Sequence, residues 1–243
     1  VQTCALPIWH KKPTVSLVVA CKDRQQNLSL SLKSWTNSKK IDEIVIVDFS
    51  SKQYLSENKA IDTLIRSDSR IKLLRVEGEE YFNLGKAYNV GIDNSTGDFV
   101  LKMDCDYFLK DDDWIDDIIH QYRVNGQNHY IYGSYEFSDS LSGFVCFKRT
   151  DTRFREDLNG WGYDDTDIKK RMDVENKDYT PARAISEAGT FVKNNYDVNS
   201  DSWKLGDDSS ISVKQNVSNN TPKKDLSKED EGVIQYYLNK VKK

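Results

Sequence analysis

Val15-Ser-Leu-Val-Val-Ala20 is the first of several short β-branched runs that alternate with longer segments along the chain. Residues 43–48, 71–76 and 98–103 are further runs of this kind, and apolar residues recur at helical spacing between them. Short strands that alternate with helices are typical of a parallel sheet with crossover connections. The sequence therefore predicts an α/β fold that begins with four strands and three intervening helices.

The regular alternation weakens in the second half of the chain. A helix is predicted over residues 114–122, and strands are predicted near residues 130–137 and 143–148. We expect one domain over residues 9–198, in which helices flank a mixed, mainly parallel central sheet. Residues 199–243 form a polar extension whose end has the pattern of a terminal helix. Residues 1–8 resemble a translated sequencing adapter, so we exclude them from the fold.

Composition limits the classes of partner. The 243 residues carry a formal net charge of −4, which gives no global positive field for nucleic acid. The longest apolar run is far shorter than the roughly 20 residues that span a bilayer, so we expect no transmembrane segment. Cys21, Cys105 and Cys146 lie in apolar runs without metal-ligand spacing, which favours reduced thiols in a cytoplasmic protein.

Two carboxylates follow the strand predicted over residues 98–103, in Lys102-Met-Asp-Cys-Asp106. Asp104 and Asp106 are spaced so that both can approach one hard cation that also holds diphosphate oxygens. A solvated turn is the simpler explanation of an Asp-x-Asp pattern. The position at the end of an apolar strand favours the cation site, because unpaired carboxylates are costly there.

Charged residues also follow the first two strands. Lys22 and Arg24 leave the first strand, where they can pair with a diphosphate or pack against a base. Asp48 ends the second strand and either accepts hydrogen bonds from a nucleotide base or caps a helix. Spacing alone does not choose between these two roles for Asp48.

The third motif is a glycine-flanked tryptophan in residues 159–167. Gly160 and Gly162 allow a tight loop that exposes one face of Trp161, and sugars stack on such rings. Three carboxylates follow at a predicted helix start, where the helix dipole favours ionised Asp side chains. Helix capping by one of them is the alternative, but capping does not require the Gly-Trp-Gly sequence.

Together these motifs resemble the inverting glycosyltransferases of the GT-A fold, family 2-like, and most of all the beta-galactosyltransferase and chondroitin-polymerase-type catalytic domains. The resemblance rests on five segments in matching order: Lys22-Asp-Arg24, Ile46-Val-Asp48, Phe82-Asn-Leu-Gly-Lys-Ala-Tyr-Asn-Val-Gly91, Met103-Asp-Cys-Asp106 and Gly160-Trp-Gly-Tyr-Asp-Asp165.

The resemblance implies a role for each matched residue. Nucleotide binding falls to Lys22, Arg24, Asp48, Lys86, Asn89 and Asp104. Asp106, with Asp104, would bind a divalent cation, Mn²⁺ or Mg²⁺. Trp161, Gly162 and Asp164 would contact the donor and acceptor sugars, and Asp165 would be the catalytic base.

Two positions depart from the family pattern. Asp164 stands where the family usually has Glu, which shortens a side chain near the acceptor. Relatives often supply a histidine metal ligand after the catalytic loop, whereas all three histidines of this chain precede Asp165. Glu187 or water is a candidate for the remaining position.

The implied reaction is transfer, with inversion, of a hexose or N-acetylhexosamine from a nucleotide diphosphate sugar, with UDP as the expected nucleotide. The acceptor would be a glycan or lipid-linked hydroxyl in surface polysaccharide or glycolipid synthesis, at the cytoplasmic face of the membrane. A sugar nucleotidyltransferase should have a Gly-rich loop near its start, but no glycine precedes Gly78. A glycan-binding module would not need Asp104, Asp106 and Asp165 together.

Overall fold

The computed structural model describes residues 12–109, 112–125, 128–134, 141–158, 164–172, 179–186, 191–197 and 202–205. Its strands are β1 (Val15–Cys21), β2 (Glu43–Phe49), β3 (Ile71–Val76), β4 (Phe99–Met103), β5 (Tyr107–Leu109), β6 (Asn128–Ser134), β7 (Leu141–Lys148), β8 (Tyr179–Ser186), β9 (Phe191–Asp197) and β10 (Ser202–Leu205). Its helices are α1 (Gln25–Asn37), the 3₁₀ helix η1 (Leu55–Glu57), α2 (Lys59–Ser67), α3 (Leu84–Asp93), α4 (Asp113–Asn125) and α5 (Asp164–Lys170).

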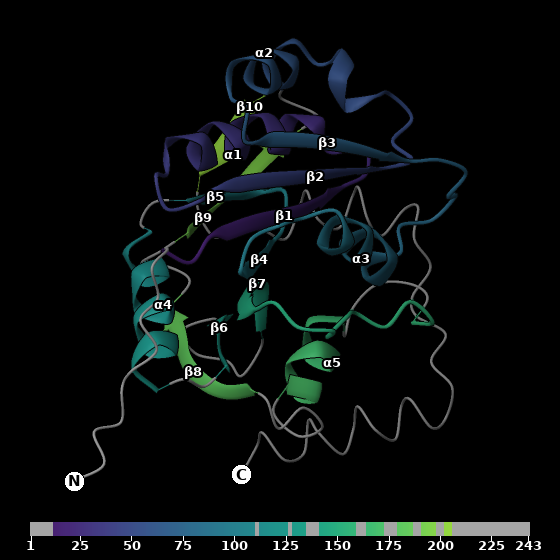
Figure 1. Ribbon diagram of the computed structural model, residues 1–243. Coiled ribbons are helices and arrows are strands. Elements are labelled where there is room, and N and C mark those ends of the chain that lie inside the picture. The colour runs from purple at the N-terminus through teal and green to yellow at the C-terminus, as the bar shows by residue number, and fades with distance from the viewer. Residues whose placement is uncertain are drawn as a thin grey trace, which may run out of the picture.

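Seven strands form the main sheet in the order β3-β2-β1-β4-β7-β6-β8 (Figure 1). β1 pairs in parallel with β2 and β4, and β2 pairs in parallel with β3. β7 runs antiparallel to both β4 and β6, and β6 pairs in parallel with β8. The predicted mixed, mainly parallel sheet is confirmed, including its four initial strands and their helical crossovers.

The sheet carries a buried apolar core on each face. Alternate residues of β1, β2 and β4 pack against α1, α2 and α4 on one face, with Trp35 and Ile115 fully buried. The other residues of these strands pack against α3 and the α5 region, through Tyr88 and Ile168. Figure 1 shows α3 and α5 on the same side of the strands. Burial on both faces explains the nearly continuous apolar sequence of the central strands.

A second, three-stranded sheet was not predicted. β5 pairs antiparallel with β9, which in turn pairs antiparallel with β10. β5 has three residues, too few to show a strand period, and its partner lies more than eighty residues away in the sequence. β10 shows that part of the polar segment after residue 198 is strand. Residues 1–11 and those after 205 lie outside the described residues. They include the adapter-like start and the predicted terminal helix.

The helical segment between β2 and β3 is divided in two. A single 3₁₀ turn, η1, precedes α2, and Asn58 between them accepts hydrogen bonds from the amides of Ala60 and Ile61. An asparagine cap of this kind satisfies amides that have no partner within the helix. Within the part of the chain that the structure describes, no helix has both the length and the apolarity that a membrane crossing requires. The three cysteines expected to be reduced are buried free thiols.

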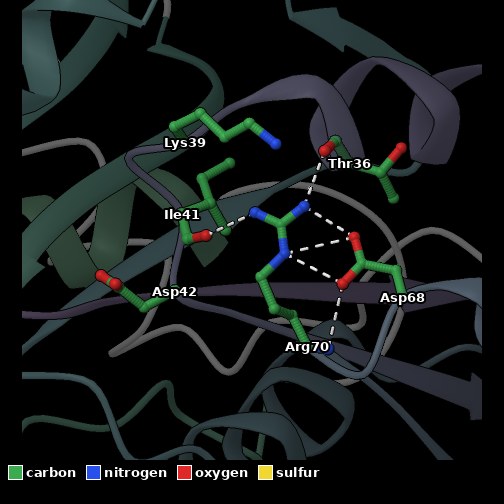
Figure 2. Close-up of a pocket in the computed structure, with 6 residues that line it drawn as sticks. All are labelled: Thr36, Lys39, Ile41, Asp42, Asp68 and Arg70. Atoms are coloured by element: carbon green, nitrogen blue, oxygen red, sulfur yellow. Dashed lines mark hydrogen bonds and ion pairs between the residues drawn. The ribbon is translucent and has the colours of Figure 1, made fainter.

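Arg70 joins two helix ends at the amino-terminal edge of the parallel strands. Its guanidinium donates to the carbonyl oxygens of Thr36, Ser38 and Ile41 at 2.6–2.8 Å, and it pairs with Asp68. Thr36, Ile41, Asp68 and Arg70 line part of a shallow depression of about 460 Å³, into which the guanidinium projects (Figure 2). The donated bonds satisfy carbonyls at the end of α1, so Arg70 acts as a structural clamp.

We therefore expect Arg70→Met to destabilise the fold by about 1–3 kcal/mol, because it removes the donors of three carbonyl groups and the partner of Asp68. Urea unfolding measures this change. Arg66→Met is the matched control, because Arg66 is exposed and pairs with Asp62 along its own helix, α2. Equal urea midpoints for the Arg70 and Arg66 variants would show that the clamp does not stabilise the fold.

Candidate active site

The candidate residues gather at the carboxyl ends of β1, β2 and β4. These strands are parallel neighbours, so the segments that follow Cys21, Phe49 and Met103 emerge at one edge of the sheet. This is the edge at which open α/β sheets bind ligands. The predicted residues after the three strands therefore belong to one region.

Lys102 connects two of the predicted carboxylates. Its side chain is fully buried, and its Nζ lies 2.9 Å from Oδ1 of Asp104 and 2.7 Å from Oδ1 of Asp165. Nζ also lies 4.8 Å from the centre of the Tyr88 ring, whose hydroxyl donates to Asp104. The structure thus brings together the candidate nucleotide ligand Asp104 and the candidate base Asp165 through a lysine to which sequence analysis gave no role.

Electrostatics in this group are dominated by the carboxylates. Burial alone would lower the pKa of Lys102, but the charges of Asp104 and Asp165 outweigh it and hold that pKa above its ordinary value. For Asp104, desolvation raises the pKa; Lys102 opposes this rise, while Asp165 and Asp106 add to it. A further positive charge close to Asp104 would stabilise the ionised form of its carboxyl group.

Arg24 and Asp106 form a second buried ion pair. Arg24 Nη2 lies 2.9 Å from Asp106 Oδ2, and the side chains are 11% and 4% exposed. Burial opposes the charge of Arg24, but Asp106 raises its pKa above the ordinary value. Arg24 was expected to bind a diphosphate and Asp106 a cation, whereas in this structure the two residues neutralise each other.

Asp48 organises the turn that follows β2. Its carboxylate is 2% exposed and accepts hydrogen bonds from the amides of Ser51 and Leu55, both at 3.2 Å. Arg75 Nη1 lies 2.8 Å from Asp48 Oδ2. Leu55 is the first residue of η1, so the Asp48 carboxylate fixes the turn that leads from β2 into this 3₁₀ helix.

Lys22 ties the same turn to the loop after β3. Its Nζ donates to the carbonyl oxygens of Phe49, Ser50 and Glu79 at 2.8–3.3 Å. Burial is the main reason that the pKa of Lys22 lies below its ordinary value. Lys22 thus lies at the predicted edge of the sheet, but its ammonium group donates hydrogen bonds to carbonyl oxygens of the protein.

Asn89 fixes residues 154–156, which precede the predicted Gly-Trp-Gly loop in the sequence. Its Nδ2 donates to Phe154 O and Glu156 Oε1, and its Oδ1 accepts from the Phe154 amide, all at 2.8–2.9 Å. Gly85, one turn earlier in α3, allows this approach, because a Cβ there would lie 2.1 Å from the Arg155 carbonyl oxygen. The contacts of Asn89 are therefore structural, and they hold residues 154–156 against α3.

Lys86 lies at the start of α3 and faces solvent more than Asn89 does. Its amide is capped by Asn83, and its Nζ pairs with the carboxylate of Glu79. The Lys86 side chain is 42% exposed. It is thus more accessible than Arg24 and Asn89, two other side chains predicted to contact nucleotide.

The start of α5 places the neighbouring carboxylates Asp164 and Asp165 in different surroundings. Asp164 is buried, whereas the Asp165 side chain is 28% exposed and points to Lys102. The remaining predicted loop residues, Trp161 and Gly162, lie outside the described residues, as does Glu187. The structure therefore distinguishes two residues that composition alone cannot separate.

The available donor groups are suited to a hard cation but do not enclose one. Among the described residues, no group of three or more His, Cys, Asp or Glu side chains is arranged to hold a metal ion. Asp104, Asp106 and Asp165 carry three negative charges against the two positive charges of Lys102 and Arg24, which leaves one net negative charge. Asp104 and Asp106 offer oxygen ligands, which Mn²⁺ and Mg²⁺ accept.

The site and its sheet match a known family. The sequence profile described as glycosyl transferase family 2 matches residues 16–169, which include Lys22, Asp104, Asp106 and Asp165. The chain belongs to this glycosyltransferase family. None of the curated proteins matches the chain at a significant level.

Solved structures with this fold include a mannosyltransferase from Pyrobaculum calidifontis in complex with GDP-Man and Mn²⁺. It is 15% identical over 74% of this chain and 58% of its own, with a TM-score of 0.58. TarS of S. aureus, residues 1–349, is 16% identical over 73% of this chain and 59% of its own, with a TM-score of 0.55. TarS with UDP-GlcNAc aligns with a TM-score of 0.54 at 15% identity.

These similarities show the GT-A fold that the motifs predicted. The chain spans less than three fifths of the length of each of these structures.

Proposed function

We propose that the protein transfers a hexose or N-acetylhexosamine from a nucleotide diphosphate sugar to a glycan or lipid-linked hydroxyl, with inversion. The proposal rests on the two ion pairs of Lys102, which hold Asp104 beside Asp165 at the edge where such sheets bind ligands. Family membership supports the reaction class. The GDP-Man and UDP-GlcNAc complexes of the similar structures motivate a nucleotide sugar as donor, with UDP preferred.

The donor diphosphate would lie over Asp104 and Asp106. Arg24 would exchange its contact with Asp106 for a phosphate oxygen, for which its guanidinium geometry is suited. Asp106 and Asp104 would hold Mn²⁺ or Mg²⁺, which neutralises charge on the departing diphosphate. Lys22, Asp48, Lys86 and Asn89 would support the nucleotide pocket mainly through the turns and loops that they fix.

Asp165 would accept the proton of the acceptor hydroxyl. Lys102 contacts its Oδ1, and the Asp165 side chain as a whole is 28% exposed, so an acceptor hydroxyl could reach the carboxylate. Deprotonation of the hydroxyl as it attacks the anomeric carbon yields one displacement, which inverts the configuration. Asp164, Trp161 and Gly162 would contact the sugars on either side of this centre.

The biological setting follows from the acceptor class. A glycan or lipid-linked acceptor fits the synthesis of surface polysaccharide or glycolipid, carried out in the cytoplasm at the inner face of the membrane.

A donor panel tests the reaction class. The protein is incubated with Mn²⁺ and nucleotide sugars that carry galactose, glucose, mannose or N-acetylhexosamines on UDP or GDP, and released nucleotide is measured. We expect slow release of UDP from at least one UDP-sugar. Release of pyrophosphate from UTP and a sugar 1-phosphate would instead identify a nucleotidyltransferase, and binding of glycans without any nucleotide release would identify a binding module.

A further inference from the structure

Lys102 occupies a position in β4 that the sheet reserves for apolar side chains. Its partners on the neighbouring strands are Val18 of β1 and Val145 of β7. Val100, two residues earlier on the same face, is completely buried in the core against α3 and α5. A valine would satisfy packing at position 102, so the fold alone does not explain a buried lysine there.

The contacts of Lys102 exceed those needed to neutralise one charge. A buried ammonium group needs a carboxylate partner, and Asp104, two residues along the chain, already supplies one. The second carboxylate, Asp165, comes from α5, more than sixty residues away in the sequence. The Tyr88 ring lies against the same ammonium group. Lys102 therefore links α5, in the second half of the chain, to the carboxyl end of β4.

We propose that Lys102 is a positioning residue that sets the placement of the Asp165 carboxylate relative to Asp104. This inference rests on the proposed role of Asp165 as the base. Lys102 holds Oδ1 of each carboxylate, so the Asp165 side chain cannot rotate freely, and its other oxygen keeps one direction toward the acceptor. Correct placement of a reacting group is worth orders of magnitude in rate, and small displacements are costly.

A double-mutant cycle tests this role. Lys102→Met, Asp165→Asn and the double variant are compared for kcat, with folding checked by thermal melts and donor affinity checked by calorimetry with UDP and Mn²⁺. We expect Lys102→Met to lower kcat at least about tenfold, because the base is no longer held. In the Asp165→Asn background, the same change should lower kcat by less than about threefold, since no base remains to be positioned.

Val100→Ala is the matched control, because it weakens the same strand face without touching a carboxylate. It should keep kcat in both backgrounds even where its melting temperature falls. If Lys102→Met does not fold, Lys102→Arg keeps a charge in the core and is used in the same cycle.

Additive effects of the Lys102 and Asp165 changes would overturn the positioning role, as would an unchanged kcat in the Lys102 variant. Retention of wild-type kcat by Asp165→Asn alone would instead remove the proposed base, and with it the group that Lys102 is proposed to position.

Discussion

Asp165→Asn should lower kcat at least about a hundredfold while leaving the affinity for the nucleotide sugar close to that of the wild type. The amide has nearly the same shape as the carboxylate, and its oxygen can still accept a hydrogen bond from Lys102. It cannot take the proton of the acceptor hydroxyl. Steady-state kinetics with donor and acceptor, together with calorimetric donor titration, separate the loss of kcat from any change in binding.

Asp164→Asn is the control, because it makes the same chemical change one residue earlier in α5. We expect it mainly to raise the acceptor KM, as when a binding contact weakens while the base remains. An inactive Asp164→Asn beside a fully active Asp165→Asn would identify Asp164 as the base. Full activity of both variants would show that neither Asp164 nor Asp165 takes part in the reaction.

Asp106→Asn should abolish the enhancement of nucleotide binding by Mn²⁺. The amide keeps the shape of the side chain but lacks the charge that attracts a divalent cation beside two phosphates. It also leaves the buried Arg24 without its ion-pair partner. Calorimetric titration with UDP, with and without Mn²⁺, measures the difference directly.

Asp62→Asn is the control for Asp106, because Asp62 lies on α2 and pairs with Arg66 along that helix. It should show the same Mn²⁺ enhancement as the wild type. An equal enhancement in the Asp106 variant would exclude Asp106 from the cation site.

The first half of the fold could be predicted because its signals are local. β1, β2 and β3 are strands of six or seven residues that are rich in apolar and β-branched side chains, and the helices between them carry apolar residues at helical spacing. β5 and β9 gave no such signal, because a short strand is specified by a partner far away in the sequence. Their pairing depends on the tertiary fold, which periodicity does not report.

The same contrast between local signals and long-range contacts applies to the candidate site. The positions of Asp104, Asp106 and Asp165 followed from motifs, and the structure links Asp104 to Asp165. The role of Lys102 could not be predicted, because it depends on where α5 docks. Its one sequence signal was a charge at an apolar position in a central strand. Spacing left Asp48 open to two roles, and the structure adds that its carboxylate accepts hydrogen bonds from the amides of Ser51 and Leu55.

A crystal structure of the protein with UDP and Mn²⁺ would show where the donor and the cation bind. We expect the cation and diphosphate beside Asp104 and Asp106 at the carboxyl ends of β1 and β4, with Arg24 on a phosphate oxygen and Asp165 facing the space for the sugar. Nucleotide bound at another edge of the sheet, with the Arg24–Asp106 pair intact and no cation beside Asp104, would contradict this expectation.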